Sequence, residues 1–343
     1  MDGDGSELVT MFVPANASII RYSPKQIPTR DIENTLENFY YVDAFNGWTA
    51  NPESTTPDEW TEQNIGRASK DRTFYPTFEK KSVYDNVLDE SYFTYYADTL
   101  SFNTNTLRGK ITIPAQYQGM YPTKFAQGQC NPGITHIFFE EGSRIREFNA
   151  DAFRNTTSNP TSEDSPHSLR YVELPNDNFI IGNSCFMYCI RLFNDPVITQ
   201  DMIDDFFSHI TYLSEGSFAG TYVVGSSNGG FLNDKEVHLP GSLQFIASHA
   251  FMNSRIKKIV FGSSSYAFMN ASDNYFGGAY VSTNYGVLHN CTHMVNGIRE
   301  DVEIVVYYPD SLDMHQYYNK LFGWQEGSAE PTNPIEFIMA PRP

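Results

Sequence analysis

The pattern of apolar and polar positions repeats along the middle of the chain. A small residue followed by phenylalanine marks each copy, and the marked rings are 33, 32 and 33 positions apart, at Phe153, Phe186, Phe218 and Phe251. A large apolar residue stands five positions before each ring, at Phe148, Ile181, Leu213 and Ile246, and a small or short polar residue stands four before it. Such a period predicts stacked units, each of which buries an apolar edge against the next.

Alternation with a period of two predicts a strand beside each copy, over residues 134–139, 169–174, 237–239 and 256–261. Ile111–Ile113 is expected to open the repeats, with Phe125 as a degenerate first copy. One helix is predicted over 197–210, with Thr199 as its N-cap and Asp201 in its first turn. Its apolar face comprises Met202, Ile203, Phe206, Phe207 and Ile210.

The stretches Leu169–Cys189 and Val237–Asn253 have a strand, a proline, an apolar step and a small–aromatic pair in that order. This order resembles the units of BspA-like leucine-rich repeat proteins, and the resemblance covers about Gly109 to Trp324. It implies a mainly β chain with short helices, folded as a leucine-rich-repeat solenoid whose extra length lies in insertions. Residues 301–343 resemble the C-terminal cap of such arrays, with Trp324 folding back before an extended tail.

The N-terminal region contains Phe45-Asn-Gly-Trp48 and, after a polar stretch, Asp71-Arg-Thr-Phe-Tyr75-Pro-Thr-Phe78. These two segments resemble the Listeria–Bacteroides repeat, a small β-grasp-like module that acts as a spacer or interaction unit. The resemblance implies that Trp48 anchors a core against Tyr75 and Phe78. Short strands are also expected at residues 9–13 and 19–22. The expected organisation is residues 1–80 as this module, 81–108 as a linker or N-terminal cap, 109–300 as repeats, and 301–343 as cap and tail.

The negative net charge of the chain argues against anionic binding partners. The formal net charge is −18, which opposes binding to nucleic acid or to an anionic membrane. No apolar run is long enough to span a bilayer, so membrane insertion is not expected. The acidic, polar N-terminus, Met1-Asp-Gly-Asp-Gly-Ser-Glu, differs from a secretory signal and favours a virion protein, a cytosolic protein or a mature extracellular fragment.

Few residues suggest a metal-binding or catalytic site. His289, Cys291 and His293 have metal-ligand types but also fit a polar strand face. Asp201, Asp204 and Asp205 fit either a cation site at a helix end or a solvated face. Cys185 and Cys189 are expected to be buried thiols. The sequence has no phosphate loop or dinucleotide motif, and paired catalytic carboxylates have no local signature. We therefore expect a non-enzymatic protein without a metal or cofactor.

The inner face of a repeat array is its usual binding surface. Aligning the strands places on this face a mixed aromatic, acidic and imidazole strip made of His136, Phe138, Tyr171, Glu173, Glu236, His238, Lys258 and Val260. Such a strip suits a protein or a glycan partner, although an ordinary solvated sheet face has the same pattern.

Taken together, these features favour a bacteriophage virion protein for structure or attachment, present in several copies and in contact with other virion proteins or a host-surface protein or glycan. The alternative is a bacterial cell-surface or secreted BspA-like adhesin. A glycan-active enzyme is a third and weaker class.

Overall fold

The computed structural model divides the chain into two compact units, Met1–Asn86 and Val87–Pro343. It describes residues 30, 32–59, 72–128, 131–154, 169–220, 235–247 and 249–261, together with the backbone of four short strands further along the chain. Within these residues the protein is mainly β, with five sheets and one α-helix.

In the described part of the first unit, β1 (Tyr41–Thr49) and β2 (Tyr75–Ser82) form an antiparallel hairpin. Phe45 and Phe78 face each other across it, with ring centroids 6.4 Å apart. The register shifts between Phe45 and Gly47. Gly47 has φ 148°, and a Cβ added to it would lie 2.5 Å from the Pro57 Cβ. Glycine is therefore required at this bulge. The strands expected at 9–13 and 19–22 lie outside the described residues.

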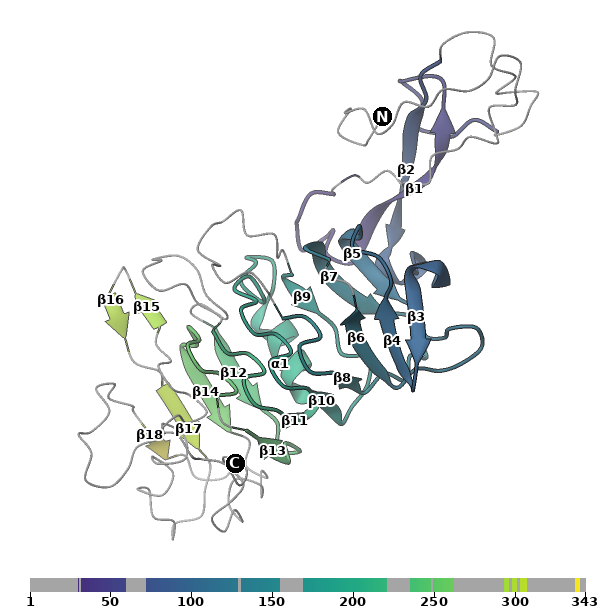
Figure 1. Ribbon diagram of the computed structural model, residues 1–343. Coiled ribbons are helices and arrows are strands. Elements are labelled where there is room, and N and C mark those ends of the chain that lie inside the picture. The colour runs from purple at the N-terminus through teal and green to yellow at the C-terminus, as the bar shows by residue number, and fades with distance from the viewer. Residues whose placement is uncertain are drawn as a thin grey trace. The chain divides into compact units, whose positions relative to one another are not determined.

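A seven-stranded sheet runs through the second unit in the order β13-β11-β10-β8-β6-β4-β3 (Figure 1). Its strands are β3 (Phe93–Tyr96), β4 (Thr99–Phe102), β6 (Lys124–Gly128), β8 (Glu147–Phe148), β10 (Phe179–Ile181), β11 (Ile210–Leu213) and β13 (Phe245–Ile246). All neighbours are parallel except β3 and β4, which form a hairpin. Ala97 and Asp98 close this hairpin, with φ values of 46° and 64°. Two-residue turns need positive φ at both positions when their twist matches that of the strands.

Two further parallel sheets lie in the second unit. One contains β5 (Arg108–Ile113), β7 (Gly133–Phe139) and β9 (Tyr171–Val172). The other contains β12 (Glu236–Leu239), β14 (Lys258–Phe261), β17 (Glu303–Val306) and β18 (Phe337–Met339). A small antiparallel pair, β15 (His293–Val295) and β16 (Ile298–Glu300), completes the described strands. The described residues also contain two 3₁₀ turns, Val83–Asp85 in the first unit and Glu90–Tyr92 in the second.

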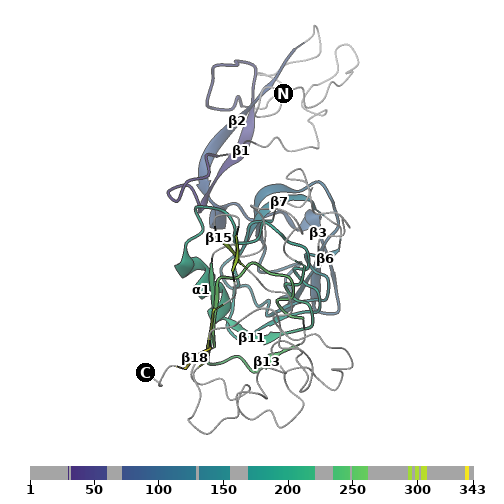
Figure 2. The same cartoon turned by 90° about the vertical axis from the view of Figure 1, so that its left-hand side faces the viewer.

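The helix α1 (Gln200–Ser208) lies between β9 and β12 and separates these two sheets (Figure 1). In the turned view, α1 and β6 are on opposite sides of the unit (Figure 2). Thr199 caps the helix, because its hydroxyl accepts a hydrogen bond from the Met202 N–H at 3.4 Å. The predicted helix is thus confirmed. Its last expected residue, Ile210, instead begins β11, where its side chain is still buried.

The rings that mark the sequence repeat form one column in the core. Centroids are 5.3 Å apart for Phe153 and Phe186, 5.2 Å for Phe186 and Phe218, and 5.4 Å for Phe218 and Phe251, with ring planes within 13° of parallel. Phe125 extends the column by stacking on Phe153 at 5.6 Å. On β6, however, Phe125 pairs with Phe148, so it belongs to the strand column of the repeat rather than to the ring position.

Backbone hydrogen bonds join each repeat to the next. At the small-residue position, the N–H groups of Gly182, Ser214 and Ala247 donate to the preceding repeat at 2.9, 3.0 and 2.8 Å. At the ring position, Phe153 and Phe186 donate to the following repeat at 2.8 and 2.7 Å. These bonds explain why the two positions recur together in the sequence.

Gly182 makes the closest of these approaches. A Cβ there would lie 2.5 Å from the Phe148 carbonyl oxygen and 2.6 Å from the Asn149 carbonyl carbon. Backbone cannot move aside as a flexible side chain can, so the small residue is needed for contact between these two repeats.

The strands expected at 134–139 and 237–239 are present as β7 and β12. The strand expected at 169–174 is reduced to Tyr171–Val172 in β9, and that expected at 256–261 to Lys258–Phe261 in β14. Trp324 lies outside the described residues, whereas Phe337–Met339 of the tail pairs with β17.

Candidate functional site

The residues predicted to form a binding strip fall into two groups on either side of α1. His136 pairs with Tyr171 between β7 and β9, while Glu236 pairs with Lys258 between β12 and β14. His238 lies opposite Val260 in the second group. Because α1 occupies the place between the groups, they do not form one continuous sheet face.

The expectation that the first group faces outward is wrong for three of its residues. His136, Phe138 and Tyr171 are only 3, 0 and 2 % exposed. Their rings pack together: Phe138 lies 5.8 Å from Tyr171, and the His136 imidazole is parallel to the Phe138 ring at 6.3 Å. Both faces of β7 are therefore covered, as is usual for parallel sheets, and in the sequence only the apolar run at residues 137–139 indicated this.

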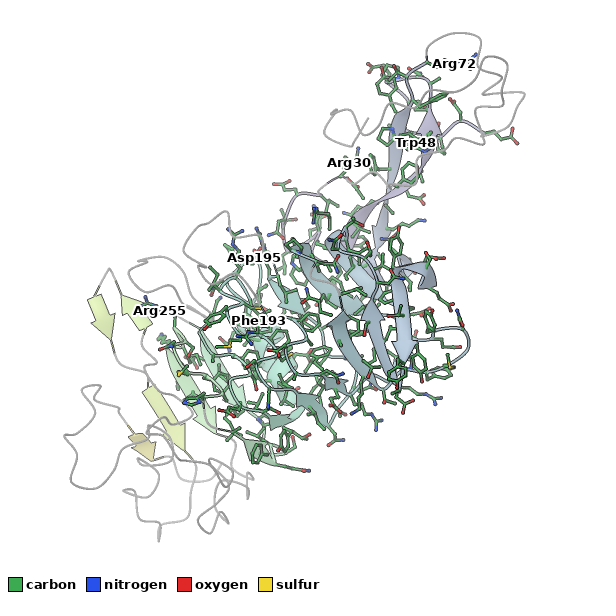
Figure 3. The ribbon with its side chains drawn as sticks, viewed as in Figure 1. Arg30, Trp48, Arg72, Phe193, Asp195 and Arg255 are labelled. Carbon is green, nitrogen blue, oxygen red and sulfur yellow. The ribbon has the colours of Figure 1, made fainter. Side chains whose placement is uncertain are left out.

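Part of the cover comes from the segment between the Phe186 turn and α1. Figure 3 labels Phe193 and Asp195 of this segment. The Phe193 ring packs edge-on against Tyr171 at 6.1 Å, and the Phe193 N–H donates to the Arg170 carbonyl at 2.8 Å. Asp195 from the same segment is buried and accepts a hydrogen bond from Arg170 Nη1 at 2.9 Å. The sequence offered no local sign of this contact, because its partners are 25 residues apart.

Burial governs the charges around Asp195. Desolvation, reinforced by repulsion from Lys110, lowers the pKa of His136 to about 3, so the imidazole is neutral at physiological pH. Desolvation also lowers the pKa of Lys110, which pairs with His136 across β5 and β7, to about 8. The carboxylate of Asp195 opposes both shifts. A buried, doubly hydrogen-bonded carboxylate of this kind anchors a segment, since Asp195 also accepts from the Val197 N–H at 3.1 Å.

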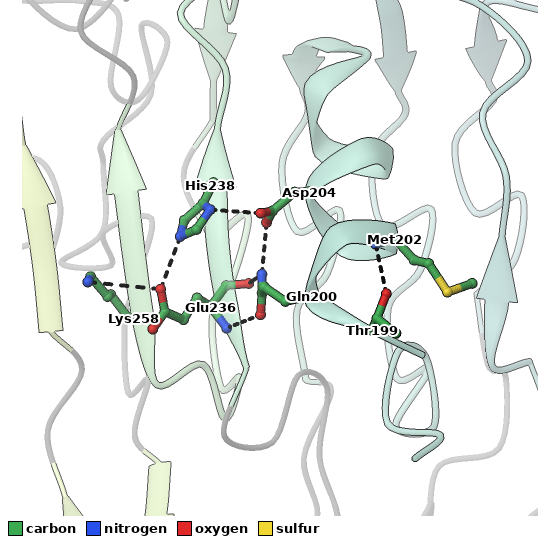
Figure 4. Close-up of polar contacts among 7 residues, drawn as sticks. All are labelled: Thr199, Gln200, Met202, Asp204, Glu236, His238 and Lys258. Atoms are coloured by element: carbon green, nitrogen blue, oxygen red, sulfur yellow. Dashed lines mark hydrogen bonds and ion pairs between the residues drawn. The ribbon is translucent and has the colours of Figure 1, made fainter. Parts of the chain in front are cut away.

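The second group forms a partly exposed polar network (Figure 4). His238 lies between two carboxylates, with Nδ1 3.0 Å from Asp204 and Nε2 3.0 Å from Glu236. Lys258 Nζ lies 3.9 Å from the same Glu236 carboxylate. The network links α1 to β12 and β14, and both nitrogens of the imidazole are occupied by protein groups. Exposed pairs of this kind contribute about 0–1 kcal/mol each.

Gln200 completes the junction between α1 and β12. Its side-chain amide donates to the Glu236 carbonyl at 2.9 Å and accepts from the Glu236 N–H at 3.2 Å (Figure 4). It thereby replaces the neighbouring strand that β12 lacks on this side. Nothing in the local sequence singled out Gln200, because its role depends on a residue 36 positions away.

The other predicted residues are placed as follows. The Trp48 ring, half-buried, packs against Phe45 at 5.2 Å, and Phe45 lies between Trp48 and Phe78. Tyr75, which is half-buried, pairs with Thr49 at the end of the hairpin. Glu173, after β9, is half-buried.

Cys185 and Cys189 are buried free thiols, as predicted, and burial raises the pKa of Cys185. His289 and Cys291 lie outside the described residues, and of His293 only the backbone, at the start of β15, is described. Asp201, Asp204 and Asp205 lie on α1. Within the described ranges, no three His, Cys, Asp or Glu side chains are arranged to hold a metal ion.

No helix in the described part of the chain has the length and apolar character needed to cross a membrane. Comparison of the chain with models of known protein families, with curated proteins and with solved structures found no match.

Proposed function

We propose that this chain is a non-enzymatic structural or attachment protein of a bacteriophage virion. In this proposal the second unit is a BspA-like leucine-rich-repeat solenoid, and the first unit is a β-grasp-like Listeria–Bacteroides module that serves as spacer or interaction unit. The virion carries several copies of the chain. Its partners are neighbouring virion subunits and a host-surface protein or glycan.

The observation that supports this proposal most is the column of rings from Phe153 to Phe251. Each ring stacks on the next at 5.2 to 5.4 Å, and backbone hydrogen bonds follow the same interval. Proteins built from stacked repeats act mainly through their extended surfaces. The polar groups best placed for chemistry support the same view, because Asp195 and His238 are engaged by other parts of the chain.

Charge supports the choice of partners. With a formal net charge of −18, the chain repels nucleic acid and anionic lipid, whereas a protein with basic patches or an uncharged glycan meets no such barrier. The same charge limits uncontrolled association between copies.

The proposal is tested by locating the protein. Antibodies against the purified chain are applied to phage particles from lysed cultures and to intact host cells, with immunogold detection and peptide mass analysis of gradient-purified particles. Regular labelling of particles, with peptides in a fixed ratio to the major capsid protein, is the expected result. Labelling of cell surfaces without particles would instead support the alternative, a bacterial adhesin, and would refute the virion assignment.

A further inference from the structure

Three of the four histidine side chains in the described part of the chain lie beside a carboxylate of the preceding repeat. The pairs are His209 with Asp177, His238 with Asp204, and His249 with Glu215. Their closest nitrogen–oxygen distances are 2.7, 3.0 and 3.5 Å in that order, and their members are 32, 34 and 34 residues apart in the sequence. These intervals are close to the 32 or 33 residues between stacked rings, so each pair joins one repeat to the next.

The three pairs lie at different places around the stack. One precedes β10 and β11, one joins α1 to β12, and one joins the turns after β11 and β13. The first crosses the boundary between the Phe186 and Phe218 repeats, and the other two cross the boundary between the Phe218 and Phe251 repeats. A change in imidazole charge therefore acts on the contact between repeats at three separate points.

His238 has the geometry that a protonated ring requires. Its Nδ1 lies 3.0 Å from Asp204 on α1, and its Nε2 lies 3.0 Å from Glu236 on its own strand (Figure 4). A neutral imidazole has a single N–H, so it can donate to only one carboxylate while its other nitrogen turns a lone pair towards the second. The imidazolium donates to both and has the opposite charge. The Lys258 ammonium, 3.9 Å from Glu236, is a second cation beside that carboxylate and lowers the gain there.

We propose that these imidazoles make the contact between repeats dependent on pH, with His238 as the main contributor. As the pH falls from 8 to 6, protonation of His238 adds an attraction to Asp204 and Glu236 that only the folded chain can use. The free energy of unfolding therefore rises, and the repeats are held together more firmly in mildly acidic surroundings. The pH dependence does not require the proposed function, because it arises within the chain.

The other imidazoles contribute less than His238. The ring nitrogens of His209 lie 2.7 Å from Asp177 and 3.7 Å from Asp205, but these carboxylates are 81 and 65 % exposed, so water screens their attraction. The carboxylate beside His249 is 61 % exposed. Buried His136 acts in the opposite direction below pH 6.5, because its imidazole stays neutral in the folded chain.

Urea unfolding of the full chain at pH 8 and pH 6 tests the proposal. For each chain, the folding equilibrium constant at pH 6 is divided by the constant at pH 8. This ratio is expected to be about fivefold larger for the wild type than for His238→Gln, which corresponds to about 1 kcal/mol, the size of one or two partly exposed ion pairs. Glutamine keeps a donor and an acceptor but does not titrate, so a role in packing alone leaves the ratio unchanged. Other titrating groups, His136 included, contribute equally to both chains.

Asp204→Asn removes the α1 carboxylate while keeping an acceptor for Gln200, and it should reduce the ratio about twofold. Asp201→Asn removes an exposed charge from the same helix and is the matched control, with an expected ratio equal to that of the wild type. The proposal is overturned if the wild type and His238→Gln have the same ratio, or if Asp204→Asn and Asp201→Asn reduce it equally. A smaller ratio for the wild type than for His238→Gln would overturn it as well.

Discussion

The ring column makes a quantitative prediction at Phe186, which stands in its middle. The ring is fully buried, with stacked neighbours Phe153 and Phe218 at 5.3 and 5.2 Å. It also meets Phe148 and Phe206 edge-on at 6.0 and 6.3 Å. Replacing it by alanine removes contacts with both adjoining repeats at once.

The expected cost of Phe186→Ala follows from these contacts. Burial of a phenylalanine side chain contributes about 1.5–3 kcal/mol, and each favourable ring pair adds about 0.5–1.5 kcal/mol. With the two stacked pairs counted, the sum is about 2.5–6 kcal/mol, a range that contains the usual cost of truncating a buried phenylalanine, about 3–5 kcal/mol. Since a domain is stable by only about 5–15 kcal/mol, the variant should lose a large part of its stability.

Urea unfolding followed by far-UV circular dichroism measures this loss. Phe186→Leu, which keeps most of the apolar volume, should cost less than about half as much and covers the case in which the alanine variant fails to fold. Tyr96→Ala, an exposed aromatic in the same unit, should change the free energy of unfolding by less than about 0.5 kcal/mol. A loss below about 1 kcal/mol for Phe186→Ala in a normally folded protein would refute the idea that the column stabilises contact between repeats.

Three further perturbations probe the close approach, the buried imidazole and the α1 junction. Gly182→Val should cost about 2–3 kcal/mol in urea unfolding, whereas Ser214→Val should cost less, because the same position of the next repeat already carries a Cβ. Equal costs would contradict the close-approach argument. His136 should make the protein less stable as the pH falls from 6.5 towards 3, by up to about 1.4 kcal/mol per pH unit, because the unfolded chain takes up a proton that the buried imidazole does not. His136→Gln should flatten this slope relative to the wild type between pH 4 and 6.5, and an unchanged slope would rule out His136 as its source. Gln200→Leu should cost about 1–2 kcal/mol, because the backbone N–H and C=O of Glu236 lose their partner. Asp201→Asn on the same helix removes only a favourable charge from the first turn and should cost less than about 1 kcal/mol. Faster hydrogen exchange at the Glu236 amide is expected for Gln200→Leu alone.

Local sequence signals predicted the elements whose contacts are repetitive or close in sequence. The helix was evident from Thr199 and the apolar spacing that follows it, and β7 and β12 from their alternation. The shortening of β9 to two residues was not evident from the local sequence. Backbone bonds to the β7 side do continue beyond β9, from the Arg170 N–H to Thr135 and from the Glu173 N–H to Ile137.

The candidate binding strip shows the limit of the same reasoning. Period-two alternation assigned His136, Phe138 and Tyr171 to one face correctly, but it carries no information on what covers that face. The Phe193 ring covers part of it from the segment between the Phe186 turn and α1. Burial of a strand face by a distant segment is a long-range contact, and it produces no periodic pattern in the sequence.

The order of residues alone determined the spacing of the buried rings, since a side chain that recurs every 32 or 33 positions must meet its counterpart when the units stack. The small residue at Gly182 was also visible in the sequence, and the structure shows that it is needed where the Phe148 carbonyl oxygen approaches. Only the tertiary structure decided that α1 would stand between β9 and β12, that Gln200 would pair with the free edge of β12, and that Tyr96 would remain in solvent. These outcomes depend on residues from distant parts of the chain. Their burial and hydrogen bonding are determined by the surfaces that pack together, not by the neighbouring residues in the sequence.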